Sequence, residues 1–417
     1  MTAHEGAPAP GSSLWKDFPF ILAAALGFSV SSIHFYSFGL FMKPLQAEFG
    51  WSRSEISGSL MLISAAGVLS APFIGMLIDR WGSRRVGMPG VVAYTSAFAL
   101  LALAGPSIWS FWAGFLLLSI SITTITATVW SRAVAAHFDV RRRGMAIALA
   151  LCGSSLGMFV APLVADVLIS HYGWRAGYIG LAALFAGMAL PMILFFFHDD
   201  PVAGTETLPT SGVASAEIGI SPREAFRSVR FWSLVAASLI ASVSVLALVS
   251  HLVPLITDTG LKTSIAAAAA SMIAITSMLG RLAEGYLLDR FKGPAISAIS
   301  LLVPSLACLL ILFVPPSPGW AFAIALVLGL AVGAEVNIFA YLTSRYFGVR
   351  HFGVLFGIVY SMVILGGGIG PLMAGTIFDR TGSYEWVAWT VLPLCIACAA
   401  LVLTLGPYPE RDESAFD

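Results

Sequence analysis

One polar motif occurs twice between long apolar runs. It reads Gly75-Met-Leu-Ile-Asp79-Arg80-Trp-Gly82-Ser-Arg84-Arg85 in the first part of the chain and Gly285-Tyr-Leu-Leu-Asp289-Arg290-Phe-Lys292-Gly293 in the second. The copies begin 210 residues apart, at 75 and 285, in a chain of 417 residues. A repeat of about half the chain length indicates two structurally similar halves.

The composition predicts a membrane protein. The chain is 58% hydrophobic and only 11% charged, whereas soluble domains are about 45–50% apolar and about 25% charged. Its 22 Lys and Arg residues balance 22 Asp and Glu residues. Binding of nucleic acid through bulk positive charge is therefore excluded as an interpretation.

Apolar stretches of at least 20 residues, long enough to cross a bilayer as helices, alternate with short polar breaks. Strands of a membrane barrel would be about 10 residues long and would alternate apolar with polar residues, and these stretches do not. The prediction is an all-α membrane protein with twelve transmembrane helices, six in each of two pseudo-symmetric bundles. The expected spans are Phe18–Met42, Ile56–Ile78, Val86–Gly105, Ile108–Trp130, Gly144–Ile169, Ala176–Phe197, Phe231–Ile256, Ile265–Leu288, Ala295–Val314, Trp320–Leu342, Phe352–Phe378 and Trp386–Leu405.

The spans imply five regions: a tail at 1–17, a six-helix bundle at 18–197, a linker at 198–230, a second bundle at 231–405 and a tail at 406–417. Lys and Arg concentrate in cytoplasmic loops of membrane proteins. With the N-terminus inside, the inner loops hold 16 of the 22 cations, the outer loops hold five, and one lies in a span. We therefore expect both termini to be cytoplasmic and the protein to lie in the plasma membrane, or the inner membrane of a bacterium. Ser221 and Glu224 predict a capping box that opens a short helix in the linker.

The repeated motif resembles the signature of the major facilitator superfamily between its second and third helices, and the resemblance covers nearly the whole chain. It implies that two bundles rock about a central substrate site. In that family fold the motif controls the rocking, with the aspartate accepting hydrogen bonds from a helix N-terminus of the other bundle. The residues assigned to this role are Gly75, Asp79, Arg80, Gly82, Arg84, Arg85, Gly285, Asp289 and Arg290.

Within that family the chain is similar to the branch of monocarboxylate transporters and oxalate:formate antiporters. The resemblance rests on the segment from Phe41 to Ile56, on Arg142 to Gly157, and on Gly280-Arg281. It implies a small organic anion as substrate, no cofactor and no obligate protein partner. Animal members of the branch carry an aspartate at the position of Ser277, so proton coupling is less secure than anion recognition.

Arg281 is the most informative single residue. It lies about eight residues from the cytoplasmic end of its span, roughly 12 Å deep, where an arginine costs about 2.5–3.5 kcal/mol on insertion scales. A guanidinium matches a carboxylate through two hydrogen bonds and does not deprotonate. Contact with a substrate carboxylate is the preferred role, and an internal ion pair between helices is the alternative.

Two carboxyl groups are candidates for proton coupling. Glu335 has a similar depth to Arg281 and could neutralise it when the substrate site is empty. Glu284 competes for this role because it lies three residues from Arg281 on one helix face. Asn337 is a further candidate for substrate contact, although it and Glu335 point about 200° apart on their helix.

The remaining candidates for substrate contact are His34, Tyr36, Tyr341 and Tyr360, with His34 also a candidate for proton coupling. Each of them has a plain packing role as its alternative.

Two apparent motifs of other protein classes are dismissed. The G-x-S-x-G string at Gly153–Gly157 lies in an apolar helix, where helix packing through two small residues is expected in place of a hydrolase nucleophile. All four cysteines lie in spans, so neither a disulfide nor a metal site is expected.

The sequence thus predicts a transporter of a small carboxylate by alternating access, with no catalytic residues. The alternatives are an exporter of drugs or hydrophobic metabolites by proton antiport and a membrane sensor on the same scaffold.

Overall fold

The structure, a computed structural model, describes residues 17–138, 140–198, 219–291, 293–348 and 350–408. Within these ranges the side chains of residues 71, 72, 74, 75, 79 and 140–142 are not described. The described residues form helices and no strand, and the predicted all-α class is confirmed. Most of the predicted tails and linker, at 1–16, 199–218 and 409–417, lies outside the described residues, so their boundaries stay predictions.

The N-terminal half contains nine α-helices and three short 3-10 segments among the described residues. They are α1 (Phe18–Ser29), η1 (Val30–Ser32), α2 (Ile33–Tyr36), α3 (Phe38–Phe49), α4 (Arg53–Trp81), α5 (Ser83–Leu100), η2 (Leu101–Leu103), α6 (Ile108–Ile122), η3 (Thr123–Ile125), α7 (Ala127–His137), α8 (Val140–Leu151) and α9 (Gly153–Phe196).

The C-terminal half begins with the short helix α10, which has the predicted capping box: Glu224 N–H donates to the Ser221 hydroxyl, and Ser221 N–H donates to the Glu224 carboxylate. The described helices of this half are α10 (Pro222–Arg227), α11 (Val229–Ser250), α12 (Leu252–Asp258), α13 (Thr263–Arg290), α14 (Gly293–Phe313), α15 (Pro318–Phe347), α16 (Phe352–Thr381) and α17 (Glu385–Leu403).

Ten segments of the described chain are long and apolar enough to cross a membrane. One of them, Arg143–Phe196, contains the fifth expected span and all but the last residue of the sixth, because α9 continues through a break at Gly173. The second expected span is α4, which is not among the ten and has several side chains outside the description. With α9 counted twice and α4 added, all twelve expected segments are helical.

Several expected spans are interrupted, which the sequence analysis did not predict. The seventh divides into α11 and α12 at His251, and Pro254 explains the break because proline cannot donate a backbone hydrogen bond to the residue four positions earlier. The break in α9 is at Gly173, between the fifth and sixth expected spans, where φ is 83°, a left-handed conformation that glycine adopts without a steric penalty.

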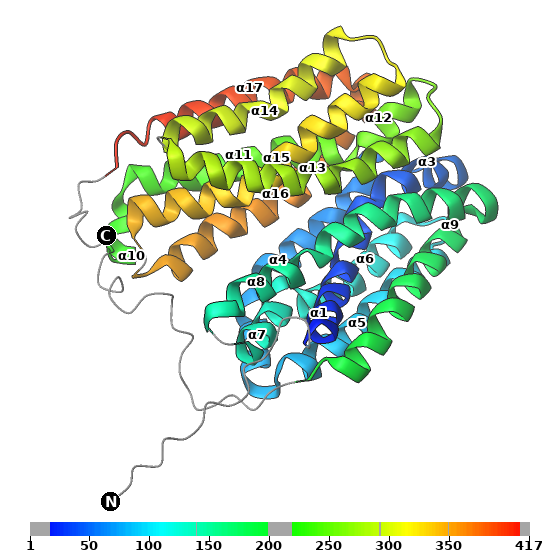
Figure 1. Cartoon of the computed structure of the whole chain (residues 1–417). Helices are drawn as coiled ribbons and strands as arrows, with labels where there is room; N and C mark the ends of the chain where they lie inside the picture. Colours follow the sequence, from blue (N-terminus) through cyan, green and yellow to red (C-terminus); the bar gives the residue numbers. More distant parts are fainter. Residues whose placement is uncertain (1–16, 139, 199–218, 292, 349, 409–417) are drawn as a thin grey trace, which may run out of the picture.

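The two halves lie side by side as separate bundles in Figure 1, with α3 and α12 close together at one end. Helix α4 packs on α16, and α9 packs on α13, across the boundary between the halves. We name the two ends of the molecule after the ends of α4, the Arg53 end and the Arg80 end.

The apolar core also distinguishes these ends. One large cluster of buried residues includes side chains from both halves, such as Phe41 and Leu255. A second cluster, with Leu301, Ile338 and Leu355, consists only of residues of the C-terminal half. The halves therefore share a core toward the Arg53 end, and part of the C-terminal half has a core of its own.

Close packing through small residues, expected at Gly153 and Gly157, is confirmed. A methyl group added at Gly157 would lie 2.2 Å from the carbonyl oxygen of Ser29 in α1, and one at Gly153 would lie 1.8 Å from that of Ala25. Helices without side chains at the contact approach each other closely and gain dispersion energy, which stabilises helix association in a bilayer.

Gly157→Ala is expected to lower the thermal unfolding temperature in detergent, because overpacking at such a contact costs about 1–3 kcal/mol. Gly187→Ala is the matched control, since Gly187 lies in the same helix and an added methyl group meets nothing within 4 Å. The control should be neutral or slightly stabilising. Equal unfolding temperatures for the two variants would contradict the role assigned to Gly157.

Candidate functional site

Arg281 lies on α13 at the boundary between the halves, and its side chain is exposed. It acts electrostatically on Tyr36 of the N-terminal half and on Tyr360 of the C-terminal half. One turn earlier on α13, the Ser277 hydroxyl lies 3.7 Å from the sulfur of Met158 in α9. Arg281 therefore lies between the two bundles, and its predicted contact with a substrate carboxylate stays a prediction.

Two predicted partners of Arg281 come from α15. The Asn337 amide donates to the backbone carbonyl of Arg281 over 3.2 Å, so Asn337 supports the arginine backbone. Glu335 is 6% exposed, and like Arg281 it acts on Tyr36 and Tyr360. Among the described residues, however, no ion pair joins Arg281 to Glu335.

His34 is buried and interacts with Tyr94, a residue that the sequence analysis did not select. The Tyr94 hydroxyl lies 3.0 Å from His34 Nδ1 and accepts the His34 backbone N–H at 3.3 Å. Tyr36 is half-buried two residues further on, at the end of α2. The break between α2 and α3 thus gathers the polar residues of the first span.

Two predicted candidates lie elsewhere. The Tyr341 ring packs against Gly293 at the start of α14, toward the Arg80 end, and the structure does not bring it to Arg281. Glu284 is 3% exposed and accepts a hydrogen bond from Ser300 of α14 over 2.5 Å. It therefore faces the interior of the C-terminal half, and sharing a helix with Arg281 did not place it on the same face.

The first copy of the repeated motif ends α4 at the Arg80 end. Gly82 has φ 86° and separates α4 from α5, while Arg80 and Arg85 are exposed. Arg84 donates to the carbonyl of Leu194 in α9 over 2.7 Å. The side chains of Gly75 and Asp79 lie outside the described residues, so their predicted gating role stays a prediction.

The second copy ends α13 at the same end of the molecule. Gly285 lies within α13, Asp289 is exposed, and the Arg290 guanidinium lies 4.9 Å from the centre of the Tyr286 ring. Lys292 falls outside the described residues. In the part of the chain that is described, no hydrogen bond joins Asp289 to the N-terminal half, so the contact expected for the closed motif is not formed here.

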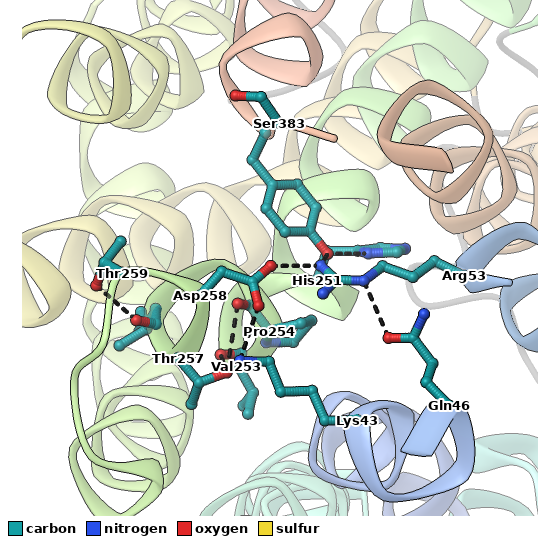
Figure 2. Close-up of polar contacts among 12 residues, drawn as sticks. Lys43, Gln46, Arg53, His251, Val253, Pro254, Thr257, Asp258, Thr259 and Ser383 are labelled. Atoms are coloured by element: carbon teal, nitrogen blue, oxygen red, sulfur yellow. Dashed lines mark hydrogen bonds and ion pairs between the residues drawn. The ribbon is translucent and has the colours of Figure 1, made fainter. Parts of the chain in front are cut away.

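The opposite, Arg53 end is closed by ion pairs between the halves. Asp258 at the end of α12 pairs with Lys43 of α3 and with Arg53 of α4, each over 2.7 Å. Figure 2 shows both cations converging on this carboxylate, with Gln46 accepting a hydrogen bond from Arg53. Burial raises the pKa of Asp258, but the hydrogen bonds and charges of Arg53 and Lys43 lower it, and the net shift is downward. Asp258 therefore stays ionised at neutral pH.

A chain of hydrogen bonds extends from Arg53 into the C-terminal half. Arg53 donates to the Tyr384 hydroxyl over 2.5 Å, and that hydroxyl lies 2.9 Å from His251 Nδ1. The other ring nitrogen of His251 lies 3.0 Å from the carbonyl of Pro371, which can only accept. His251 Nε2 must then carry the proton, and Nδ1 accepts from Tyr384. The Arg53 guanidinium also lies 3.6 Å from the centre of the Phe378 ring.

Asp379 of α16 closes the same end by capping α4 across the boundary. Its carboxylate accepts the backbone N–H groups of Arg53 at 2.9 Å and of Ser54 at 2.7 Å. These donors belong to the first turn of α4, which has no partner for them within the helix. Glu55 caps the same turn from within the N-terminal half, by accepting the N–H of Ser52.

Glu48 holds α3 against the break in α9. It accepts hydrogen bonds from the Trp174 indole over 2.5 Å and from Arg175 over 3.0 Å. These bonds lower the pKa of Glu48, so the carboxylate and its contacts persist at neutral pH and would be lost only in acid. The contact is within the N-terminal half and fixes α3, which carries Lys43.

Sequence reasoning missed this closure. Its N-terminal members lie in the segment from Phe41 to Ile56, which was recognised by resemblance but received no role. The C-terminal members, Asp258, Asp379 and Tyr384, carried no signal that could pair them with that segment, because they lie more than 200 positions away.

The architecture and the comparisons with known proteins agree. A family model described as Major Facilitator Superfamily matches residues 24–358 and 285–417 in two overlapping regions. The chain belongs to the major facilitator superfamily. It is a multi-pass membrane transporter, as the family and its relatives are, and the predicted family is confirmed.

Relatives span nearly the full length of this facilitator. The uncharacterised MFS-type transporter YcxA of Bacillus subtilis strain 168 is 24% identical over 406 residues, covering 95% of this chain and 96% of that protein. Monocarboxylate transporter 13 of Bos taurus is 26% identical over 370 residues, covering 88% and 84%. Among solved structures, the inward-facing, unoccupied bacterial homolog of the human lysosomal transporter Spinster has a TM-score of 0.73 at 18% identity, with 95% of each chain covered. The nucleoside transporter NupG has a TM-score of 0.73 at 15% identity, covering 94% and 100%.

Asp379→Asn is expected to weaken closure at the Arg53 end of the facilitator, because a neutral amide is a poorer cap and loses the favourable charge at the helix N-terminus. A lost cap costs about 0.5–2 kcal/mol, which would raise the population separated at this end by about 2- to 30-fold. Distances between spin labels on the two halves, placed at the exposed positions Tyr172 and Lys262, would measure it.

Glu55→Gln is the matched control, because it weakens a cap on the same turn of α4 without touching the C-terminal half. Its distance distribution should stay that of the unmodified labelled protein. A shift of equal size in both variants would show that the stability of α4, and not the contact between the halves, controls the separation.

Proposed function

We propose that this facilitator moves a small organic anion, preferably a monocarboxylate, across the membrane by alternating access. The observation that carries the proposal is Arg281. It is an exposed guanidinium at the boundary between the halves, near Tyr36 and Tyr360, whose hydroxyl groups can donate hydrogen bonds to an anion. The full-length similarity to monocarboxylate transporter 13 supports the same substrate class.

The surroundings of Arg281 favour binding of a ligand over a structural ion pair. Within the described residues, no carboxylate pairs with its guanidinium, and its backbone is held by Asn337. An arginine kept inside a membrane domain without a counter-ion needs water or an anion to compensate its charge. An arriving carboxylate can supply that charge through two parallel hydrogen bonds, which an aromatic drug or a neutral metabolite cannot do.

The two bundles, at 18–197 and 231–405, are the proposed moving units. The distribution of Lys and Arg supports an orientation with the Arg80 end and both termini in the cytoplasm and the Arg53 end outside, and we propose the plasma membrane as the location. In this orientation, the pairs of Arg53 and Lys43 with Asp258 close the outer side while Arg281 is accessible from the cytoplasm. Breaking those contacts and forming new ones at the repeated motif would reverse the access.

Uptake of labelled formate, lactate and oxalate into proteoliposomes tests the substrate class. Arg281→Ala should reduce carboxylate transport by at least about 10- to 100-fold, since hydrogen bonds to charged groups contribute about 1.5–3 kcal/mol. Arg281→Lys keeps the charge but loses the planar fork, so it should retain a small part of the activity.

Lys262→Ala removes an exposed cation from the turn before α13 and is the control for the change in net charge. It should transport at the rate of the unmodified protein. Full carboxylate transport by Arg281→Ala would remove the anion site from the proposal, and transport of hydrophobic compounds in place of carboxylates would favour the exporter.

A further inference from the structure

Two carboxyl groups are enclosed in the C-terminal half. Glu284 of α13 is 3% exposed and Glu335 of α15 is 6% exposed. In each of them the Oε1 atom is buried and has no hydrogen-bond partner among the described residues. Burying a polar atom without a partner costs free energy, and burying an unpaired charge costs much more. Both groups therefore require a ligand or a proton that compensates them.

Ser300 of α14 bonds one of the carboxyl groups and lines the same cavity as the other. Its hydroxyl donates to Oε2 of Glu284 over 2.5 Å, and it also lines a narrow internal cavity together with Glu335. The cavity lies between α11, α14, α15 and α17, within the C-terminal half. Its other walls are largely apolar, with Val245, Leu301 and Pro304 among them.

This cavity is separate from the exposed face of Arg281. The guanidinium is accessible between the halves, whereas the residues that line the cavity all belong to the C-terminal half. Among the described residues, neither carboxyl group forms an ion pair with Arg281. The expected direct neutralisation of Arg281 by Glu335 is therefore not the arrangement in this structure.

We propose that Glu284, Ser300 and Glu335 form a proton-binding site inside the C-terminal half, distinct from the anion site. The proton adds to a free carboxylate oxygen and converts the carboxylate to the neutral acid, which the apolar cavity tolerates. A metal ion is disfavoured, because the described residues contain no group of three or more His, Cys, Asp and Glu arranged to hold one.

The titratable groups around this site include Arg281, which lies three residues from Glu284 on α13 and acts on the same two tyrosines as Glu335. Cys395 and Cys398 of α17 line the cavity, and Tyr360 of α16 and Tyr36 of the N-terminal half interact electrostatically with Glu335. No cation lines the cavity within the described residues. Arg281 therefore acts on this site from outside the cavity, whose described lining supplies no positive charge.

The site is connected to Arg281 through the helices that carry both. Helices α13 and α15 are closely packed, and a methyl group added at Gly333 of α15 would lie 2.0 Å from the carbonyl oxygen of Ser277 in α13. Asn337 bonds the two helices at the level of Arg281. Substrate binding at Arg281 can therefore shift the two helices that hold the carboxyl groups, and proton coupling by this indirect route rests on the proposed function.

Infrared spectroscopy of the purified full-length protein, without substrate, tests the site itself. Difference spectra between acidic and alkaline pH should contain a carboxylic-acid C=O band from buried groups. Glu284→Gln and Glu335→Gln should each remove part of this band, while Glu55→Gln, at an exposed cap, should leave the buried band unchanged. Ser300→Ala should shift the frequency of the part that Glu284→Gln removes, because that frequency depends on hydrogen bonding.

Retention of the whole band in both glutamine variants, with unfolding temperatures showing that they fold, would overturn the proposal. So would a band that disappears on addition of Na⁺ alone, since that result would identify a cation site. These outcomes do not depend on any substrate, so they are separate from the test of Arg281.

Transport measurements test the coupling. Both glutamine variants should keep exchange of labelled lactate within about twofold. Accumulation of lactate under a pH gradient should fall by at least about tenfold, because it depends on the proton that the variants no longer bind; a tenfold change corresponds to about 1.4 kcal/mol. Unchanged accumulation in both variants would overturn the coupling. If the unmodified protein moves no carboxylate, the proposed function fails, while the infrared result on the buried site stands by itself.

Discussion

The first turn of α4 has backbone donors and a buried arginine that the N-terminal half cannot fully satisfy. Asp379 supplies the acceptors for the N–H groups of Arg53 and Ser54, and Asp258 supplies the counter-charge for the guanidinium. Because helix ends and buried charges are costly when unpaired, the partners in the C-terminal half must stay in place for as long as this arrangement exists. This requirement closes one end of the molecule and explains why the two bundles share a core there.

The arrangement at the Arg80 end follows from the contacts that join the halves at the Arg53 end. With the halves joined at the Arg53 end, the C-terminal half retains a separate apolar cluster, and Asp289 of the second motif copy is exposed. Arg281 is left accessible at the boundary, supported from behind by Asn337. The structure thus combines ion pairs between the halves at the Arg53 end with an exposed guanidinium at the boundary between them, an asymmetry on which the proposed alternating access rests.

Most polar side chains in the helices find local partners. Serine and threonine hydroxyls donate to carbonyls three or four residues earlier, as Ser238 and Thr343 do, and His251 is bonded at both ring nitrogens. In the described part of the chain, Oε1 of Glu284 and Oε1 of Glu335 are buried without a hydrogen-bond partner, as are some serine and tyrosine hydroxyls. Unlike a hydroxyl, a carboxyl group in such a place carries a charge unless it binds a proton, so each of these acids costs more than an apolar residue would.

The amino-acid sequence by itself determined the twelve helical segments, the two halves, the close packing at Gly157 and the selection of Arg281. These depend on hydropathy, repetition and the cost of a charge in a bilayer, which are properties of local stretches. Only the tertiary structure decided which side chains meet. Arg53 and Tyr384 are 331 positions apart, and Tyr341 and Glu284 turned away from Arg281 although their sequence positions allowed contact. The physical reason is that the rotation of each helix is set by packing against its neighbours, and a span that is apolar around its whole circumference has no periodic signal from which that rotation can be predicted.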